Sequence, residues 1–356
     1  MSTTATRAIS ATAHMPAAME RLLIVLPSWV GDVCMAIPAI AHIAAHHPRA
    51  TIVALGRANL RPLIDGLPFV SSFEGGSLRI TDGALRARVR THHPDAALLL
   101  PNSFRSALFT ALCRVPRRVG YASDLRWLLL TDRVARRTGL MNTASMYGDL
   151  AAWWTGTRPP TCVPQLAVTG AESGEADRLL GQPHDARQPL VILNPGANRA
   201  DKRWPAERFV ELSKRLVREA PTGTAPLIAV NGSPAEAELS AHIAAQTGGI
   251  DLVARRVTLG ALKALLQRAA LLITNDTGPR HMAAAFGTPT LALFGPTDCR
   301  WTPTDYPHER VMVADPFLED GLIANDHPLR CAITRIPVAD AWIAVEALLH
   351  AHAARK

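Results

Sequence analysis

The sequence predicts an α/β protein built from two doubly wound, Rossmann-like domains. Short apolar runs without polar alternation recur along the chain, which is typical of strands buried on both faces of a parallel sheet. A turn signal and a helical pattern follow each run, as in βαβ units, and the runs fall into two sets. The predicted strands are residues 22–26, 51–55 and 96–100 in the first set, and 190–194, 226–231, 271–275 and 290–295 in the second.

The chain of 356 residues is long enough for two domains, each with an ample core. Residues 1–20 are small and polar and lack the apolar core of a signal peptide, so we expect a disordered leader and a cytoplasmic protein. The Pro- and Gly-rich stretch 155–188 predicts the domain boundary. We expect an N-terminal domain over 21–170, a C-terminal domain over 187–334, and a final helix over 335–356 for which the N-terminal domain is a candidate packing partner.

Composition excludes several classes of protein. Hydrophobic residues make up 48% of the chain, but no apolar run reaches the length that spans a bilayer. The five scattered cysteines form no CxxC pair or metal knuckle, which suits a reducing compartment. The net charge of +8 reflects either solubility or an anionic substrate or membrane surface. An aromatic content of 5%, with no basic run among the aromatic residues, argues against nucleic acid as a partner.

The stretch NDTGPRH, residues 275–281, is a joint, meaning the place where a predicted strand ends and leads into a helix. Ligands of open α/β sheets bind outside the carboxyl ends of strands, so the cleft between two such domains is the expected site. Asp276 or Thr277 can cap the helix, and Pro279 suits its first turn; the free N–H groups of that turn attract phosphate. His281 can add a donor to the same anion. The alternative is an ordinary capped helix with a half-buried histidine.

A second joint, LNPGANRADKRWPAERFVEL, covers residues 193–212. Lys202 and Arg203 lie in the loop that we expect to face the same cleft, where a lysine can neutralise a diphosphate. The alternative is a solvated basic turn with Trp204 as a core residue. We favour that alternative for Trp204 but not for Lys202.

A third joint, LPSWVGDVCMAIPAI, follows the first predicted strand. Gly31 lets the backbone pass close to a ligand, and Asp32 stands at the mouth of a helix. Asp32 is either a helix cap or a general base that faces the cleft. The stretch is neither a GxGxxG fingerprint nor a GxxxxGK[ST] loop, which argues against hydride transfer and P-loop chemistry.

A fourth joint, LLLPNSFRSALFTAL, brings Asn102, Ser103 and Arg105 after the third predicted strand. Arg105 can fork onto a carboxylate or phosphate. The alternative is a surface loop that only caps its own helix.

Together these joints resemble the lipopolysaccharide heptosyltransferases of glycosyltransferase family 9, whose GT-B fold has two Rossmann-like domains facing a central cleft. The motifs that carry the resemblance are PSWVGD, PNSFRSAL with PRRVGY, NPGANRADKRWP and NDTGPRHMAAAFGTPTLALFGPTD, and it extends from about Arg21 to about Leu349. PSWVGD and NSFRSAL look most like the heptosyltransferase II group. The resemblance implies ADP-L-glycero-β-D-manno-heptose as the donor and heptose–Kdo–lipid A, the lipopolysaccharide inner core, as the acceptor. It also implies an inverting mechanism with no obligatory metal and no cofactor.

The resemblance also assigns roles to residues at matching positions. Asp32 matches the catalytic base, and Lys202 matches the lysine that contacts the donor phosphates. The donor-binding turn corresponds to Asp276, Thr277, Gly278 and His281. Asn198 matches a polar residue of the phosphate loop, and Glu236 lies where a glutamate meets the nucleoside. For the acidic acceptor we expect Asn102, Ser103 and Arg105.

Two departures leave the subtype open. Relatives of the second type carry Ser-Gly-Leu-Met or similar at 277–280, and the cysteine-rich insert of some relatives is reduced here to Cys331. The alternatives are a family 9 transferase of type I or III with another acceptor, a transferase or epimerase that uses another nucleotide sugar, and a non-catalytic nucleotide-sugar-binding protein. The implied acceptor is anionic and lies on the inner leaflet, so peripheral contact with the inner membrane surface is a further expectation.

Overall fold

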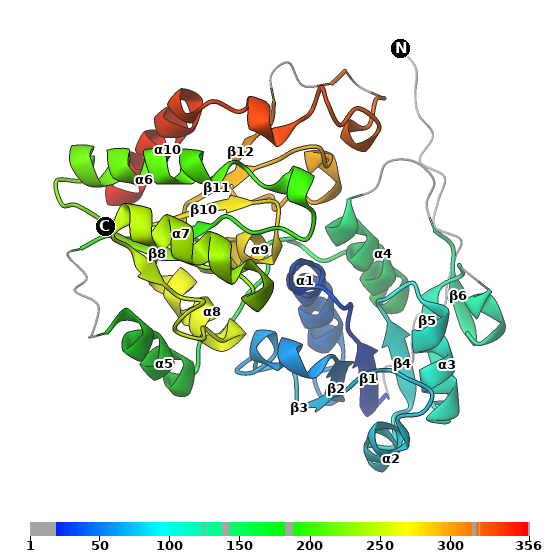
Figure 1. Ribbon diagram of the computed structural model, residues 1–356. Coiled ribbons are helices and arrows are strands. Elements are labelled where there is room, and N and C mark those ends of the chain that lie inside the picture. The colour runs from blue at the N-terminus through cyan, green and yellow to red at the C-terminus, as the bar shows by residue number, and fades with distance from the viewer. Residues whose placement is uncertain are drawn as a thin grey trace. The chain divides into compact units, whose positions relative to one another are not determined.

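The computed structural model describes residues 19–123, 125–136, 142–181, 188–314, 318–319 and 321–354. The chain divides into two compact units, Met1–Cys162 (unit 1) and Val163–Lys356 (unit 2), which are coloured blue to green and green to red in Figure 1. All but the last two residues of the predicted 1–20 leader lie outside the described residues.

Unit 1 contains a parallel six-stranded sheet with the order β3-β2-β1-β4-β5-β6. Its strands are β1 (Arg21–Val25), β2 (Thr51–Gly56), β3 (Ser72–Gly75), β4 (Ala96–Leu99), β5 (Arg117–Tyr121) and β6 (Asp132–Val134). Its helices are α1 (Val30–His46), α2 (Gly83–Thr91), α3 (Phe104–Leu112) and α4 (Thr143–Thr155), with the 3-10 turns η1 (Ala58–Leu63) and η2 (Arg126–Leu128).

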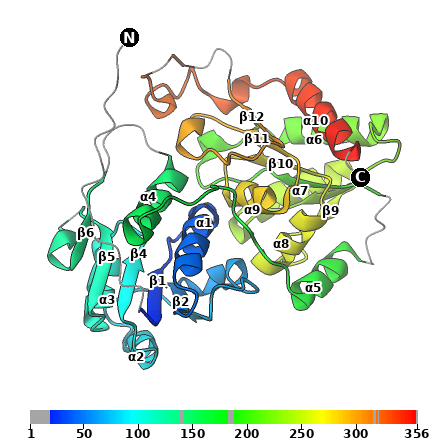
Figure 2. The same cartoon turned by 180° about the vertical axis from the view of Figure 1, so that it is seen from behind.

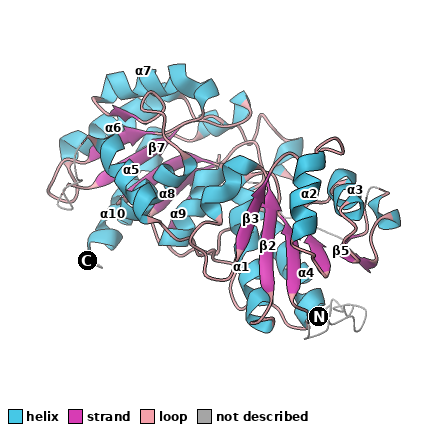
Figure 3. Cartoon of the chain, turned by 90° about the horizontal axis from the view of Figure 1, so that it is seen from below, coloured by secondary structure: helices cyan, strands magenta, loops and turns pink. Residues whose placement is uncertain are grey.

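Helices cover both faces of the unit 1 sheet, as its unbroken apolar strands require. Leu85 and Val89 of α2 and Phe109 of α3 form one buried cluster with alternate residues of β1, β2 and β4. Figure 3 shows α2 and α3 on that face. Helices α1 and α4 pack against each other on the opposite face.

Unit 2 repeats this architecture with a parallel six-stranded sheet of the order β12-β11-β10-β7-β8-β9. Its strands are β7 (Leu190–Asn194), β8 (Leu227–Val230), β9 (Ile250–Asp251), β10 (Leu271–Asn275), β11 (Thr290–Leu293) and β12 (Glu309–Met312). Its helices are α5 (Gly170–Leu180), α6 (Ala206–Glu219), α7 (Ala237–Thr247), α8 (Leu259–Arg268), α9 (Gly278–Phe286) and α10 (Val338–Ala353). Its 3-10 turns are η3 (Ala200–Lys202), η4 (Pro234–Glu236), η5 (Cys299–Trp301), η6 (Ala324–Asp326) and η7 (Ile333–Arg335).

Helices α6, α7 and α10 share one face of the unit 2 sheet, and α8 and α9 cover the other (Figures 1 and 2). The final helix, for which the N-terminal domain is a candidate packing partner, is α10, and it belongs to unit 2. Its Trp342, Val345 and Leu349 are buried in the same cluster as the strands of unit 2, because these apolar residues recur on one helical face.

All of the predicted strands are present, and the predicted α/β class with doubly wound parallel sheets is confirmed. The strands that the sequence did not reveal are the edge strands β3, β6, β9 and β12, together with β5. Edge strands are short and polar, so they lack the apolar run that marks a buried strand. Strand β5 begins with two arginines, Arg117 and Arg118, so only its second half is apolar and it does not form an unbroken apolar run. Within the described ranges, no helix is both long enough and apolar enough to cross a bilayer.

Candidate functional site

The strand order of unit 2 reverses direction at β7, which lies between β8 and β10. Asn194 at the end of β7 is in register with Thr274 near the end of β10, so the loops that follow these two strands adjoin. Such a switch point, at the carboxyl ends of parallel strands, is where open α/β sheets bind ligands. Lys202 lies in the first of these loops and Asp276 in the second.

A buried network of side-chain hydrogen bonds joins the three strands around this point. Asn194 donates to the hydroxyl oxygens of Thr274 at 3.2 Å and Thr277 at 2.9 Å. Asn231, directly after β8, donates to Asn194 Oδ1 at 2.6 Å. Buried polar groups that are fully hydrogen-bonded fix one arrangement of the backbone around them. The network therefore sets the position of Thr277 at the start of α9.

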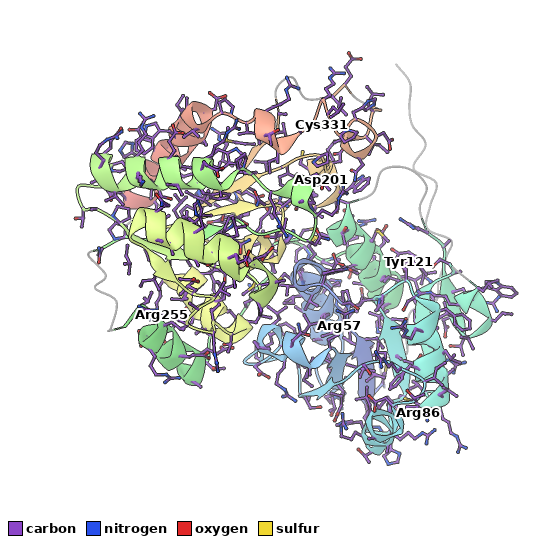
Figure 4. All side chains as sticks on the ribbon, in the orientation of Figure 1. Arg57, Arg86, Tyr121, Asp201, Arg255 and Cys331 are labelled. Atoms are coloured by element: carbon purple, nitrogen blue, oxygen red, sulfur yellow. The ribbon has the colours of Figure 1, made fainter. Side chains whose placement is uncertain are left out.

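Asn275, the last residue of β10, holds the other loop in place. Its Oδ1 accepts from the Trp204 backbone N–H at 3.2 Å, and its Nδ2 donates to the Pro195 carbonyl at 2.7 Å. Trp204 is 1% exposed and belongs to the core of unit 2, which confirms the core reading of that residue. One fully buried amide thus fixes both ends of the segment that carries Lys202. Asp201, next to this lysine, marks the segment in Figure 4.

The first turn of α9 is left open at its N-terminus. Thr277 occupies the N-cap position, but its hydroxyl accepts from Asn194 and caps no helix N–H. Pro279 is within the first turn, as predicted, and Gly287 ends the helix in the left-handed conformation. The expected capping by Thr277 is therefore wrong, and the backbone donors of this turn have no side-chain cap. An uncapped helix N-terminus attracts anions.

A salt bridge links the two loops directly. Lys202 Nζ lies 2.9 Å from Asp276 Oδ2, and only 12% and 15% of the two side chains are exposed. The same carboxylate oxygen accepts from Thr297 Oγ1 at 3.2 Å, and Arg280 lies 3.6 Å from the other oxygen. The site therefore presents a lysine whose position is fixed by a carboxylate, beside an open helix end. The solvated-turn alternative for Lys202 is wrong.

Arg280 and His281 are buried within α9. Arg280 pairs with Glu309 of β12 and donates to the Thr302 carbonyl at 2.7 Å, so it anchors the helix to the edge of the sheet. His281 is 3% exposed. Burial, reinforced by the positive charge of Arg280 and opposed by Asp276, lowers the pKa of His281 to about 3. The histidine is therefore neutral at neutral pH and adds no positive charge to the site.

Glu236 and Asn198 border the loop after β7. Glu236 accepts from the backbone N–H and the hydroxyl of Ser233, each at 2.8 Å, so it completes a capping box in η4. Its carboxylate lies directly over Gly196, where any β-carbon would collide with it. Arg203 approaches the same carboxylate at 3.7 Å. Asn198 is exposed in the loop.

The strand order of unit 1 reverses at β1, and Asp32 follows that strand in the first turn of α1. The N-cap of α1 is Trp29, without a side-chain cap, so the helix-cap alternative for Asp32 is wrong. Burial raises the pKa of Asp32. Burial and the nearby Asp32 charge together raise the pKa of the Tyr147 phenol on α4 well above its ordinary value. Tyr121, labelled at the end of β5 in Figure 4, donates to the Met146 carbonyl at 2.7 Å.

The loop after β4 carries the predicted acceptor residues. Ser103 is the N-cap of α3 and accepts from the Ser106 N–H at 3.3 Å, so its side chain caps the helix as the structural alternative states. Arg105 is exposed in the first turn. Asn102 Oδ1 is buried and accepts no hydrogen bond from any described residue. Asn102 and Arg105, but not Ser103, therefore retain polar groups for a ligand.

Several residues of these sites escaped the sequence analysis. Asn194, Asn231 and Asn275 are the most informative, since each stands at or directly after the end of an apolar run, in LVILN, LIAVN and LLITN. An amide recurring at that position is a signal that the sequence offered. Tyr147 and Thr297 offered none, because their proximity to the two aspartates depends on tertiary packing. Among the described residues, no group of three or more His, Cys, Asp or Glu side chains is placed to hold a metal ion.

Comparison with known proteins places these features in a family. Residues 83–315 match the model of glycosyltransferase family 9 (heptosyltransferase). Lipopolysaccharide heptosyltransferase 2 of Salmonella typhimurium is 31% identical over 306 residues, 80% of this chain and 85% of the relative. Its Escherichia coli K12 counterpart is 28% identical over 314 residues, with the same coverage.

Solved structures agree with the sequence relatives. The structure of E. coli ADP-heptose LPS heptosyltransferase II matches with a TM-score of 0.75 and 26% identity, over 93% of this chain and 99% of that one. The family 9 glycosyltransferase of Veillonella parvula shares the fold, with a TM-score of 0.81 at 20% identity, over 95% of this chain and 99% of that one. The chain therefore has the GT-B fold and belongs to glycosyltransferase family 9, the heptosyltransferases, in which its relatives include lipopolysaccharide heptosyltransferase 2.

Proposed function

We propose that this glycosyltransferase transfers L-glycero-D-manno-heptose from ADP-heptose to the heptose–Kdo–lipid A inner core of lipopolysaccharide, with inversion at the anomeric carbon. The observation that carries the proposal is the Lys202–Asp276 pair beside the uncapped start of α9. A fixed cation and a row of backbone donors suit a diphosphate that gains charge as it leaves. The names of the relatives at 31% and 26% identity supply the sugar and the acceptor class.

In this proposal unit 2 holds the donor. Lys202 and the N–H groups from Gly278 onward contact the diphosphate, and the exposed Asn198 adds a polar contact from the loop. Asp276 faces the heptose while it fixes Lys202. Glu236 contacts the nucleoside through Oε1, the carboxylate oxygen that accepts no hydrogen bond in the capping box. Thr277 accepts a hydrogen bond from Asn194, and His281 is buried and neutral. Both residues therefore support the conformation of the donor-binding turn and do not contact the donor as charged groups.

Unit 1 holds the acceptor and the base. Asp32 makes no side-chain hydrogen bond or ion pair with any other described residue, so its carboxylate is available for a proton. Its raised pKa makes it a stronger base than a solvated aspartate. Arg105 and Asn102 are the candidate contacts for an acidic acceptor, because an arginine fork suits phosphate and carboxylate groups.

The proposed reaction is a single displacement. A hydroxyl oxygen of the acceptor heptose bonds to the anomeric carbon of the donor, and the bond from that carbon to the phosphate oxygen breaks. The hydroxyl proton passes to Asp32, and the bonding electron pair leaves with ADP. Lys202 and the start of α9 stabilise the charge on the departing diphosphate. Attack from the opposite side of the leaving group inverts the anomeric centre.

The proposed acceptor lies on the inner leaflet, so we place the reaction at the cytoplasmic surface of the inner membrane. The test is ADP release from ADP-heptose with and without heptose–Kdo–lipid A, with the product identified by mass spectrometry. Acceptor-dependent release with a mass gain of one heptose supports the proposal. Release only with another core acceptor, or only from another nucleotide sugar, would contradict this substrate pair but keep the enzyme class. Donor binding without any release would indicate a binding protein.

A further inference from the structure

The turn Leu125–Leu128 of unit 1 carries an unusual group of exposed apolar side chains. Leu125, Trp127 and Leu128 are 68%, 42% and 63% exposed, and Arg126 between them is fully buried. Phe104, 42% exposed, begins α3, the helix that packs against this turn. Single exposed apolar residues are ordinary, but a cluster of them marks a surface that binds a protein or a membrane. We call Leu125, Trp127 and Leu128 the apolar turn.

The exposure of the apolar turn does not reflect loose packing, since arginine side chains fix its backbone. Arg126 reaches inward and donates to the Tyr121 carbonyl at 2.6 Å and to the Pro101 carbonyl. Arg118 donates to the Leu129 carbonyl at 2.6 Å, and Arg133 to that of Trp127 at 3.0 Å.

The backbone at the apolar turn is itself unfavourable for its residue. Leu125 has a φ of 57°, in the left-handed region that a bulky residue seldom adopts. A leucine held in that conformation and pointed into solvent is costly in two ways, because both its backbone and its apolar surface are unfavourably placed. Residues held in such conformations cluster at functional sites.

The charge around the apolar turn is positive. Residues 101–136 contain seven arginines and two aspartates. Arg105, Arg133 and Arg136 are exposed. The charge of Asp132 is neutralised by Arg117, at 2.6 Å. An acidic surface is therefore the complementary partner.

We propose that the apolar turn is the contact through which this protein docks onto an anionic lipid surface. Arg133 stacks on the Trp127 ring, with its guanidinium carbon 5.2 Å from the ring centre. A tryptophan with an adjacent arginine suits the headgroup level of a bilayer, where the ring is half immersed and the cation meets phosphate. The two leucines then reach the acyl boundary. The inference rests on the proposed function only in that the proposed acceptor lies in such a membrane.

The test uses the full chain and vesicles of roughly 3:1 phosphatidylethanolamine to phosphatidylglycerol, with phosphatidylcholine vesicles for comparison. The variant is Leu125→Asn/Trp127→Gln/Leu128→Ser, in which asparagine tolerates the left-handed conformation. Its matched control is Leu329→Ser/Ile343→Ser, which removes two apolar side chains of unit 2 that are 88% and 65% exposed. Cosedimentation measures binding at about 0.05 M and about 0.5 M NaCl, and thermal unfolding confirms that each variant is folded.

The expected result is salt-sensitive binding to the anionic vesicles that falls at least about 10-fold in the apolar-turn variant and is unchanged in the control. Failure of the wild type to bind, equal binding to phosphatidylcholine, or equal loss in the control would overturn the inference. So would a wild-type dimer in sedimentation velocity that the apolar-turn variant makes monomeric, since the turn would then join two copies.

Transfer assays separate this inference from the proposed function. Vesicle-embedded acceptor and a water-soluble, deacylated inner-core acceptor are compared. The apolar-turn variant should lose rate only on the embedded acceptor. Vesicle binding that depends on the turn, without heptose transfer to either acceptor, would refute the proposed function and leave the inference intact. Heptose transfer without vesicle binding that depends on the turn would refute the inference and leave the proposed function intact.

Discussion

The two units each place an aspartate beside a switch point of their sheet, but they hold it in opposite ways. Asp276 of unit 2 is bound by Lys202 and Thr297, with Arg280 close by. Asp32 of unit 1 has no hydrogen-bonded or ionic side-chain partner among the described residues, and burial raises its pKa. The same residue type beside the switch points of two similar sheets, after β1 in one and after β10 in the other, is thus fixed in one unit and left free in the other.

This difference assigns different work to the two carboxylates. A carboxylate that is paired with a cation is a poor proton acceptor and serves to orient its partner. A desolvated carboxylate without a cation is the form in which an aspartate becomes a better base. The energetic consequences of a substitution also differ, because removing one partner of the buried pair leaves an uncompensated charge, whereas removing the unpaired Asp32 charge leaves none.

The largest expected effect follows from Asp32→Asn, which removes the base and keeps the shape. Turnover should fall about 10²- to 10⁴-fold, the usual contribution of a general base. The free energy of unfolding at neutral pH should not decrease, because the folded protein no longer contains an unpaired carboxylate whose raised pKa disfavours its ionised form. Initial rates with saturating donor and chemical denaturation of the same preparations measure the two quantities.

Asp65 of the same unit, whose side chain is 40% exposed, supplies the matched control, since Asp65→Asn should change neither quantity. The wild-type kcat/KM should also decline as the pH falls. The apparent pKa of this decline should lie above 3.8, the ordinary pKa of aspartate. A variant that retained wild-type turnover, or a loss of turnover explained wholly by unfolding, would remove Asp32 from the mechanism.

Lys202→Met removes the cation that pairs with the fixed carboxylate of Asp276. ADP affinity should fall about 10- to 100-fold, because a hydrogen bond to a charged group contributes about 1.5–3 kcal/mol. The free energy of unfolding should drop by about 1–3 kcal/mol, less than for a fully buried pair, because Asp276 keeps Thr297 and Arg280. Calorimetric titration with ADP and denaturation report the two losses.

The exposed pair Arg199–Asp201 lies in the same loop and gives the control for Lys202. Asp201→Asn should alter stability by no more than about 0.5 kcal/mol, since exposed pairs contribute little. Unchanged ADP affinity in Lys202→Met would separate this lysine from the donor phosphates, even if stability falls as expected.

Asn275→Ala probes how unit 2 keeps its site rigid. The substitution leaves the Pro195 carbonyl and the Trp204 N–H without their partner, at a cost of about 1–3 kcal/mol of stability. ADP affinity should fall as well, because the segment that carries Lys202 loses its anchor. The exposed Asn198 supplies the contrast, since Asn198→Ala should weaken ADP without changing the unfolding midpoint. Wild-type ADP affinity in a destabilised Asn275→Ala would show that the anchor serves stability alone.

The sequence predicted the fold through its buried strands, because a strand with both faces covered must be apolar along its whole length. It also predicted that Asp32, Lys202 and Asp276 come after the carboxyl ends of strands, which parallel strands bring to one edge of a sheet. Edge strands such as β9 were missed, since two residues contain no periodicity.

What the sequence did not reveal depends on contacts between distant residues. Lys202 and Asp276 are 74 positions apart, and nothing local indicates that they pair. Whether Asp32 caps its helix depends on which residue starts α1, and helix ends are the part of a pattern that periodicity defines least. Threonine is common at helix N-caps, which favoured Thr277 as a cap. Its hydroxyl instead accepts a hydrogen bond from Asn194 of another strand.

His281 gives the smallest effect at neutral pH and tests whether the charges around Asp276 are fixed. Its pKa is about 3 in the folded protein and near 6.5 when unfolded, so the unfolded chain binds the extra proton between these values. Stability should therefore be independent of this residue above pH 6.5 and decline below it, by up to about 1.4 kcal/mol per pH unit. His281→Gln should remove that part of the slope, whereas His242→Gln, on the exposed side of α7, should retain it. An unchanged slope in His281→Gln would mean that protons reach this histidine in the folded state, and that the charges beside Asp276 rearrange to admit one.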